Sequence, residues 1–169
     1  MEITIQNQAI KAVVKTKGAE LSSLQKDGKN YIWEINSEFW NKTSPILFPI
    51  VGALKNGEYF HEGKVYKLSR HGFARDFEFE VIENSENAVV FSLKSNEETL
   101  KVYPFHFELQ LSYILEGNKL MVKYQITNRS SEKMYYSVGA HPAFNIDGNF
   151  EDFSLIFDDE KDLETYKLE

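Results

Sequence analysis

Phe105-His106-Phe107-Glu108-Leu109-Gln110-Leu111-Ser112-Tyr113 is the stretch that decides the fold. Aromatic and aliphatic residues alternate with polar ones along its whole length. Residues 120–126 repeat the alternation after the turn Glu116-Gly117-Asn118. Successive side chains of a strand point to opposite faces, so a period of two gives each segment one apolar face. The two segments are therefore predicted to form an antiparallel hairpin with one face in the core.

Short strand patterns separated by turn residues continue on both sides of this hairpin. Further strands are predicted over residues 2–6, 10–15, 19–25, 31–33, 58–61, 64–68, 77–81, 88–93, 134–138 and 153–157. A single helical turn capped by Ser37 is predicted at residues 37–41. No stretch sustains a period of 3.6 residues. The predicted fold class is therefore all-β, an antiparallel β-sandwich that forms one domain over residues 1–169.

One apolar run does not fit a central strand. Residues 44–52 are fenced by Pro45 and Pro49, and a proline cannot donate a hydrogen bond to a sheet ladder. We expect this run to be extended, buried chain that crosses one end of the sandwich.

Composition and net charge indicate which classes of binding partner to expect. The 169 residues carry a net charge of −7 and contain no cysteine. Nucleic acid and anionic membrane surfaces both reward clustered Lys and Arg, and no such cluster is present. No apolar run approaches 18 residues, and the N-terminus lacks the pattern of a signal peptide. The absence of cysteine excludes disulfides and thiolate metal sites. We expect a cytoplasmic protein that binds a small molecule, with no nucleic-acid or membrane partner.

Two of the four histidines lie where a predicted strand gives way to a loop. His71 is followed by Gly72, and His141 stands between Ala140 and Pro142. Chemically active groups are often presented at such junctions, although a core histidine with satisfied ring nitrogens is the alternative. His61 and His106 are interpreted as solvated side chains.

Other chemistries have weaker signals. The chain has no H-E-x-x-H run, nucleophile elbow, P-loop or dinucleotide fingerprint. Asp158, Asp159, Glu160 and Asp162 lack EF-hand spacing and are interpreted as a solvated acidic turn. No metal site is predicted.

Four motifs together resemble the aldose 1-epimerase (galactose mutarotase-like) family, in particular its bacterial branch of LacX-like and hexose-6-phosphate-epimerase-like proteins. They agree with the family in order and spacing, and the resemblance covers essentially the whole chain. The motifs are Pro45-Ile46-Leu47-Phe48-Pro49-Ile50-Val51-Gly52, His71-Gly72-Phe73-Ala74-Arg75, Tyr103-Pro104-Phe105 and Gly139-Ala140-His141-Pro142-Ala143-Phe144. The resemblance implies a β-supersandwich that binds a hexose in a cleft.

The resemblance also implies a reaction and roles for particular residues. Family members interconvert the α and β anomers of an aldohexose by acid–base ring opening, with no cofactor. By resemblance His141 is the acid that protonates the ring oxygen, and His71 is a second catalytic imidazole. The implied substrate contacts are Arg75, Phe73, Phe144 and Asn145. Whether the hexose is phosphorylated stays open.

The chain departs from the family pattern in two ways. Relatives often carry an arginine where this chain has Ala53. The family's glutamate base lies in a C-terminal part that this chain does not match, so the chain resembles the N-terminal part of the family's domain. A sugar-binding module without catalysis is therefore the alternative function. An incomplete sandwich would also leave strand edges open for self-association, and sedimentation as a compact, stable monomer would contradict that expectation.

Overall fold

The computed structural model describes residues 1–154 and residue 156, and its longest hairpin is the one that the alternating pattern predicts. β10 (Phe107–Glu116) pairs antiparallel with β11 (Lys119–Asn128), in register from Phe107↔Asn128 to Glu116↔Lys119. Leu109, Leu111 and Tyr113 are buried on the core face of β10, as their spacing requires.

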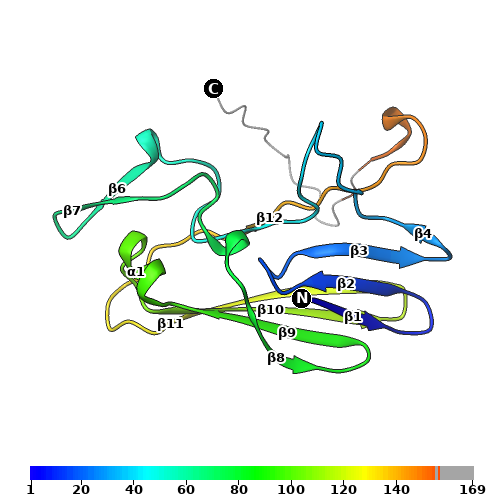
Figure 1. Ribbon diagram of the computed structural model, residues 1–169, viewed down its shortest axis with the longest axis horizontal. Coiled ribbons are helices and arrows are strands. Elements are labelled where there is room, and N and C mark those ends of the chain that lie inside the picture. Colours follow the sequence, from blue (N-terminus) through cyan, green and yellow to red (C-terminus); the bar gives the residue numbers. More distant parts are fainter. Residues whose placement is uncertain (155, 157–169) are drawn as a thin grey trace.

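Two four-stranded antiparallel sheets make up most of the described structure (Figure 1). The first has the order β1-β2-β3-β4 and the second the order β11-β10-β9-β8. Their remaining strands are β1 (Glu2–Gln6), β2 (Lys11–Lys15), β3 (Leu21–Lys26), β4 (Lys29–Asn30), β8 (Glu80–Asn84) and β9 (Ala88–Lys94). Hairpin connections dominate, so the predicted all-β antiparallel fold is confirmed.

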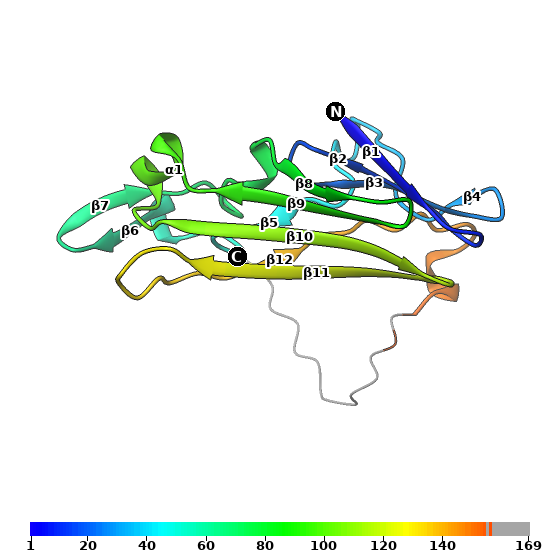
Figure 2. The ribbon, with the colours of Figure 1, turned by 90° about the horizontal axis from the view of Figure 1, so that it is seen from below.

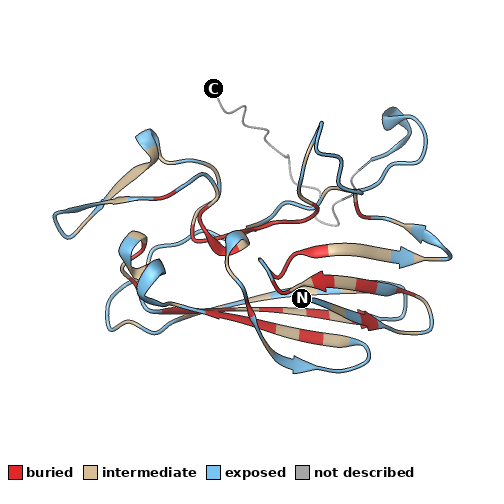
Figure 3. Ribbon diagram, viewed as in Figure 1, coloured by how far each residue is buried: buried red, intermediate tan, exposed pale blue. Residues whose placement is uncertain are grey.

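The core lies between these sheets, where red segments of both face each other in Figure 3. Ile5 and Val14 from the first sheet share one buried cluster with Phe91 and Leu111 from the second. Tyr113 adds a polar tie, because its hydroxyl donates a 2.6 Å hydrogen bond to the Ala19 carbonyl. On β11, an outer strand of its sheet, the apolar row is only half-buried: Leu120, Val122, Tyr124 and Ile126.

The proline-fenced run is buried from Ser44 to Pro49, as predicted, whereas Val51 near its end is exposed. Its centre forms β5 (Ile46–Leu47), which pairs with β12 (Gly139–Ala140) in a small two-stranded sheet. Phe48 follows at zero exposure. This small sheet runs beside the two large ones (Figure 2) and carries the chain toward both histidine motifs.

Shorter elements complete the described part of the chain. The predicted hairpin at residues 58–68 is present as β6 and β7. The bounds are β6 (Glu58–His61), β7 (Lys64–Lys67), η1 (Lys55–Gly57), η2 (Ala74–Asp76), η3 (Phe150–Asp152) and α1 (Glu97–Val102). Within the described residues, no helix has the length and apolar character that crossing a membrane requires.

Several local predictions were wrong. Helix α1 was missed, and its start is a capping box in which Asn96 and Thr99 exchange side-chain-to-backbone hydrogen bonds. Residues 134–138 form no strand. The turn at residues 37–41 is not a helical turn capped by Ser37, because the Asn36 side chain accepts from the Glu38 N–H at 3.0 Å. The strand predicted at 153–157 and the acidic turn at 158–162 lie wholly or partly outside the described residues.

Glu108 shows that the solvent-facing side of β10 is not uniformly solvated. Its carboxylate is buried, 2.7 Å from the Arg129 guanidinium, and also accepts hydrogen bonds from Gln110 and Ser92. The hydrogen bond from Arg129, followed by that from Gln110, lowers the pKa of Glu108 from 4.5 to about 2. In the folded state this carboxyl therefore stays charged at pH values that protonate an unfolded glutamate.

The lowered pKa makes stability depend on pH in a defined window. Because the folded pKa lies below the unfolded one, the stabilisation is complete above pH 4.5 and disappears as the pH falls toward about 2. We expect Glu108→Gln to lower the free energy of unfolding by about 1–3 kcal/mol at pH 7 and to flatten this dependence. Urea unfolding from pH 7 to pH 3 measures both effects. The exposed Glu83→Gln is the control, and an equal loss in both variants would contradict the prediction.

Candidate functional site

His71 and His141 lie side by side although 70 positions separate their numbers. Their ring centroids are 6.1 Å apart. Both rings line a cavity of about 250 Å³ at the junction of β5, β12 and η2. The lining residues are Trp40, Lys42, Pro45, Leu47, Arg70, His71, Arg75 and His141. The structure thus brings together the two imidazoles that the sequence singled out.

The position of His71 is fixed by a double contact with Gly52. The His71 N–H donates to the Gly52 carbonyl at 2.7 Å, and the Gly52 N–H donates back to His71 Nδ1 at 3.0 Å. Because Nδ1 accepts, the proton of the neutral ring lies on Nε2. His71 also has a φ of +69°, a strained value for a residue other than glycine. Such strain is often concentrated at functional sites.

The surroundings of His71 keep its ring uncharged. Partial burial lowers the pKa of His71 below 6.5, and the positive charges of Arg70 and Arg75 and the neighbouring His141 lower it further. A neutral imidazole whose Nδ1 is occupied can still donate one hydrogen bond from Nε2. His71 is therefore suited to hold a ligand oxygen rather than to deliver a proton.

Gly72 allows the His71 loop to lie directly against the proline-fenced run. The residue has a φ of +70°, and a Cβ there would overlap the Phe48 carbonyl and lie 2.6 Å from the Pro49 nitrogen. The same Phe48 oxygen accepts hydrogen bonds from the N–H groups of Phe73 and Ala74, at 3.0 and 3.1 Å. This contact attaches the start of η2 to the end of β5.

The segment that carries His141, residues 139–145 (the His141 arm), is anchored through its backbone. The His141 N–H donates to the Pro45 carbonyl at 3.2 Å, and the Ala143 N–H donates to the Thr43 carbonyl at 2.9 Å. Thr43 is in turn held by Glu20, whose buried carboxylate accepts from the Thr43 N–H and hydroxyl at 2.6 and 2.8 Å. One buried glutamate thus supports the segment on which the His141 arm rests.

Three cationic side chains surround the two histidines. Lys42, Arg70 and Arg75 all line the cavity. Arg75 is held in place because its guanidinium donates to the Arg70 carbonyl at 2.8 Å. Among the described residues, no aspartate or glutamate lines this cavity. Asp76 pairs with Arg75 at 3.8 Å from outside the lining, but Lys42 and Arg70 have no ion-pair partner among the described residues. The cavity therefore favours an anionic ligand group.

Not every predicted contact residue reaches the cavity. Phe73 does not line it: its ring is 7% exposed and packs edge-on against Phe48 in the core. Phe144 is exposed and bridges to Ile32, and the Asn145 side chain donates to the Asn30 carbonyl at 3.4 Å. Both lie on the continuation of the His141 arm and do not line the cavity.

The sequence reasoning also missed contributors. Trp40, Lys42 and Arg70 were not singled out as site residues, although each neighbours a quoted motif. Arg70 directly precedes His71, and Trp40 and Lys42 come just before the proline-fenced run. Neither Ala53 nor the nearby Lys55 lines the cavity.

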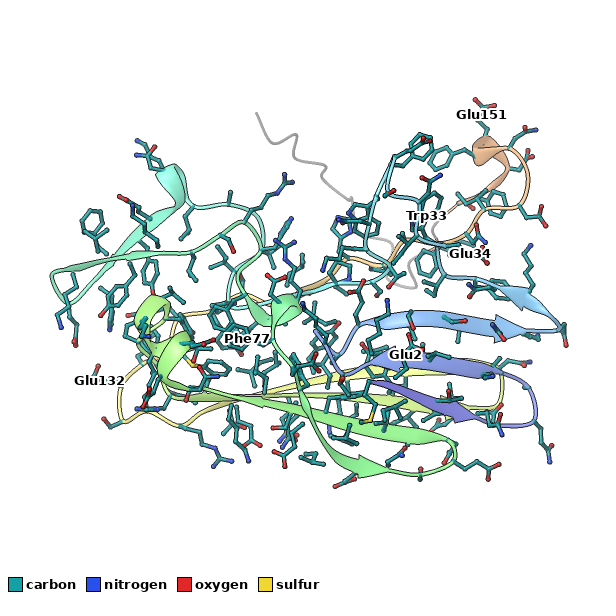
Figure 4. All side chains as sticks on the ribbon, in the orientation of Figure 1. Glu2, Trp33, Glu34, Phe77, Glu132 and Glu151 are labelled. Carbon is teal, nitrogen blue, oxygen red and sulfur yellow. The ribbon has the colours of Figure 1, made fainter. Side chains whose placement is uncertain are left out.

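A second, larger cavity of about 600 Å³ lies under the β6–β7 hairpin, with aromatic walls that include Tyr59 and Tyr103. His61 lines it, with its ring centroid 4.7 Å from that of Phe105 and the two planes tilted by 49°, and is therefore not simply solvated as expected. Ligand atoms of His61, Glu62 and Glu132 lie within 4.8 Å of one another, but both carboxylates are exposed. Glu132 projects from the loop after β11 (Figure 4). This cavity lacks the paired imidazoles and cations of the smaller one, which we therefore regard as the candidate site.

Comparison with known proteins identifies the family of the chain. The family model described as aldose 1-epimerase matches residues 1–168. The chain belongs to the aldose 1-epimerase family. The chain is 41% identical, over 168 residues, to the plasmid-encoded protein LacX of Lactococcus lactis subsp. lactis. That match covers 93% of this chain and 56% of the relative, so the chain spans about half the length of this curated relative.

Solved structures place the chain in the galactose mutarotase-like fold. A galactose mutarotase related enzyme from Lactobacillus acidophilus superposes with a TM-score of 0.86 at 44% identity, covering 89% of this chain and 51% of that one. A galactose mutarotase-like protein from Lactobacillus casei gives a TM-score of 0.85 at 41% identity, with coverage of 89% and 52%. The described fold therefore corresponds to about half of each of these two solved chains.

Proposed function

We propose that the protein interconverts the α and β anomers of an aldohexose, and that this chain supplies the imidazole side of the reaction. The observation that carries the proposal is the pairing of His71 and His141, 6.1 Å apart, in a cavity at the edge of the core. Membership of the aldose 1-epimerase family supports the same chemistry.

The two imidazoles have different roles in this proposal. His141 is exposed, has no hydrogen bond to a ring nitrogen among the described residues, and is free to give a proton to the ring oxygen of the sugar. His71 holds a sugar oxygen by donating from Nε2, because Gly52 occupies its other nitrogen. A base removes the proton of the anomeric hydroxyl, the C1–O5 bond breaks, and rotation about C1–C2 precedes closure to the other anomer. One positioned acid contributes about 10²–10⁴-fold to such a rate.

Within this proposal, the charge of the cavity favours one class of hexose as the substrate. Lys42, Arg70 and Arg75 converge on a site without a described carboxylate. Guanidinium and ammonium groups pair strongly with phosphate oxygens. A hexose bearing a phosphate is therefore the substrate that the described side chains favour over a neutral hexose.

A specific observation favours a second candidate function. No carboxylate among the described residues lines the cavity, so the described part of the chain offers no base for the anomeric hydroxyl. A sugar-binding module that does not catalyse fits this lining equally well.

Polarimetry separates the candidates. Freshly dissolved α-D-glucose, α-D-galactose and α-D-glucose 6-phosphate are each followed to rotational equilibrium with and without the protein. We expect faster equilibration, with the highest kcat/KM for the phosphorylated sugar. Uncatalysed rates for all three sugars, together with sugar-dependent quenching of tryptophan emission, would establish the binding module and exclude the isomerase.

The phosphate preference has its own test. Lys42→Met is expected to lower kcat/KM for glucose 6-phosphate by about 10–100-fold, because a hydrogen bond to a charged group is lost. The kcat/KM for glucose should stay nearly unchanged. Lys123→Met on the exposed side of β11 is the matched control. A loss of the same size for both sugars would contradict a phosphate contact at Lys42.

A further inference from the structure

Trp40 stands closest to the candidate acid among the aromatic side chains of the cavity. Its ring centroid lies 5.1 Å from that of His141, with the planes tilted by 47°. Both rings line the cavity. Among the described residues, no side chain or backbone group makes a hydrogen bond to the His141 ring, and the residue is exposed. The backbone anchor at Pro45 fixes where the arm runs but makes no contact with a ring nitrogen of His141.

The backbone of Trp40 is anchored. Its backbone N–H donates to the Asn36 carbonyl at 2.8 Å and closes a tight turn. At the base of this loop Trp33, labelled in Figure 4, donates from Nε1 to the Trp40 carbonyl at 3.2 Å. By contrast the neighbouring Phe39 is 78% exposed and contributes nothing to the cavity. A hydrogen-bonded loop therefore presents one indole to an imidazole that no hydrogen bond among the described residues orients.

We propose that Trp40 is a positioning residue, which fixes the ring of His141 in the orientation that proton transfer to the sugar requires. The inference rests on the proposed isomerase function and assigns to this loop a role in it. An indole suits the task because its broad face restricts the imidazole without competing for either ring nitrogen. A misplacement of a catalytic group by about 1 Å can cost about 10²-fold in rate.

Kinetics distinguishes positioning from simple contact with sugar. We expect Trp40→Leu to lower kcat about 10–100-fold with KM changed less than about threefold. Trp40→Phe, which keeps an aromatic face, is expected to recover most of the loss. The control is Phe39→Leu on the same loop, with kcat unchanged. A rise in KM at constant kcat would overturn the proposal, because it would make Trp40 only a platform for the sugar.

A fluorescence titration tests the ring contact without any activity. In Trp33→Phe, the remaining emission comes from Trp40, because the chain contains two tryptophans. An imidazolium ring in contact quenches indole, so emission should fall as the solution is acidified from neutral pH. The step should vanish when His141→Asn is added. Its absence in the first variant, or its persistence in the second, overturns the inference whether or not the protein is an isomerase.

Discussion

Replacing Gly72 by alanine is expected to destabilise the protein by more than about 3 kcal/mol, or to prevent folding. Gly72 has a positive φ, and a Cβ there would overlap the Phe48 carbonyl group. Relief would require moving β5 away from the His71 loop. The two hydrogen bonds to the Phe48 oxygen would be lost with that movement. Urea unfolding followed by circular dichroism measures the change in the free energy of unfolding.

The chain provides a control that separates strain from overlap. Gly63 in the β6–β7 turn has a similar φ of +75°, but no atom lies within 4 Å of its hypothetical Cβ. Gly63→Ala should therefore show only the backbone cost, about 1–2 kcal/mol. If the two variants lost the same amount, the close approach of Gly72 to Phe48 would be energetically irrelevant, contrary to our interpretation.

Replacing His141 by asparagine is expected to lower the kcat for anomer interconversion by about 10²–10⁴-fold. Asparagine keeps a polar side chain of similar reach but cannot deliver a proton near neutral pH. Because His141 is exposed, the free energy of unfolding should change by less than about 0.5 kcal/mol. Polarimetry and urea unfolding of the same preparation measure the two quantities together.

His106 is the matched control for this experiment. It is exposed, directly precedes β10 and lies near Ser95, outside the cavity of His71 and His141. His106→Asn should retain full activity. Full activity in His141→Asn would remove His141 from the mechanism, whereas equal losses in the two variants would indicate a general effect of histidine loss.

The sequence predicted the parts of the fold in which hydrophobic pattern and pairing agree. The β10–β11 hairpin was foreseen because residues 105–113 and 120–126 each alternate apolar and polar side chains. Helix α1 was not, because six residues are too few to display a period of 3.6. Residues 134–138, with two tyrosines, have the composition of a strand but pair with no neighbouring strand. The backbone of this segment hydrogen-bonds elsewhere, for example from the Ser137 N–H to the Pro49 carbonyl.

The site was predicted only where local sequence carries a signal. His71 and His141 stand at abrupt changes of backbone direction, which glycine and proline reveal. Lys42 and Arg70 give no such signal, because a surface lysine or arginine has the same sequence appearance wherever the fold places it. Phe73 adjoins the histidine motif, but its side chain is buried in the core and does not line the cavity. Motif membership alone does not say which way a side chain points.

The contacts of the His141 arm affect the order in which the parts of the protein fold. These contacts join distant parts of the chain: the Asn145 side chain, for example, donates to the Asn30 carbonyl, 115 positions away. The β8–β11 sheet, in contrast, joins neighbours in sequence. Closing long loops carries the larger entropic cost and slows folding. During synthesis the β8–β11 sheet can therefore pair before His141 leaves the ribosome, and the cavity is expected to be the last part of the described structure to assemble.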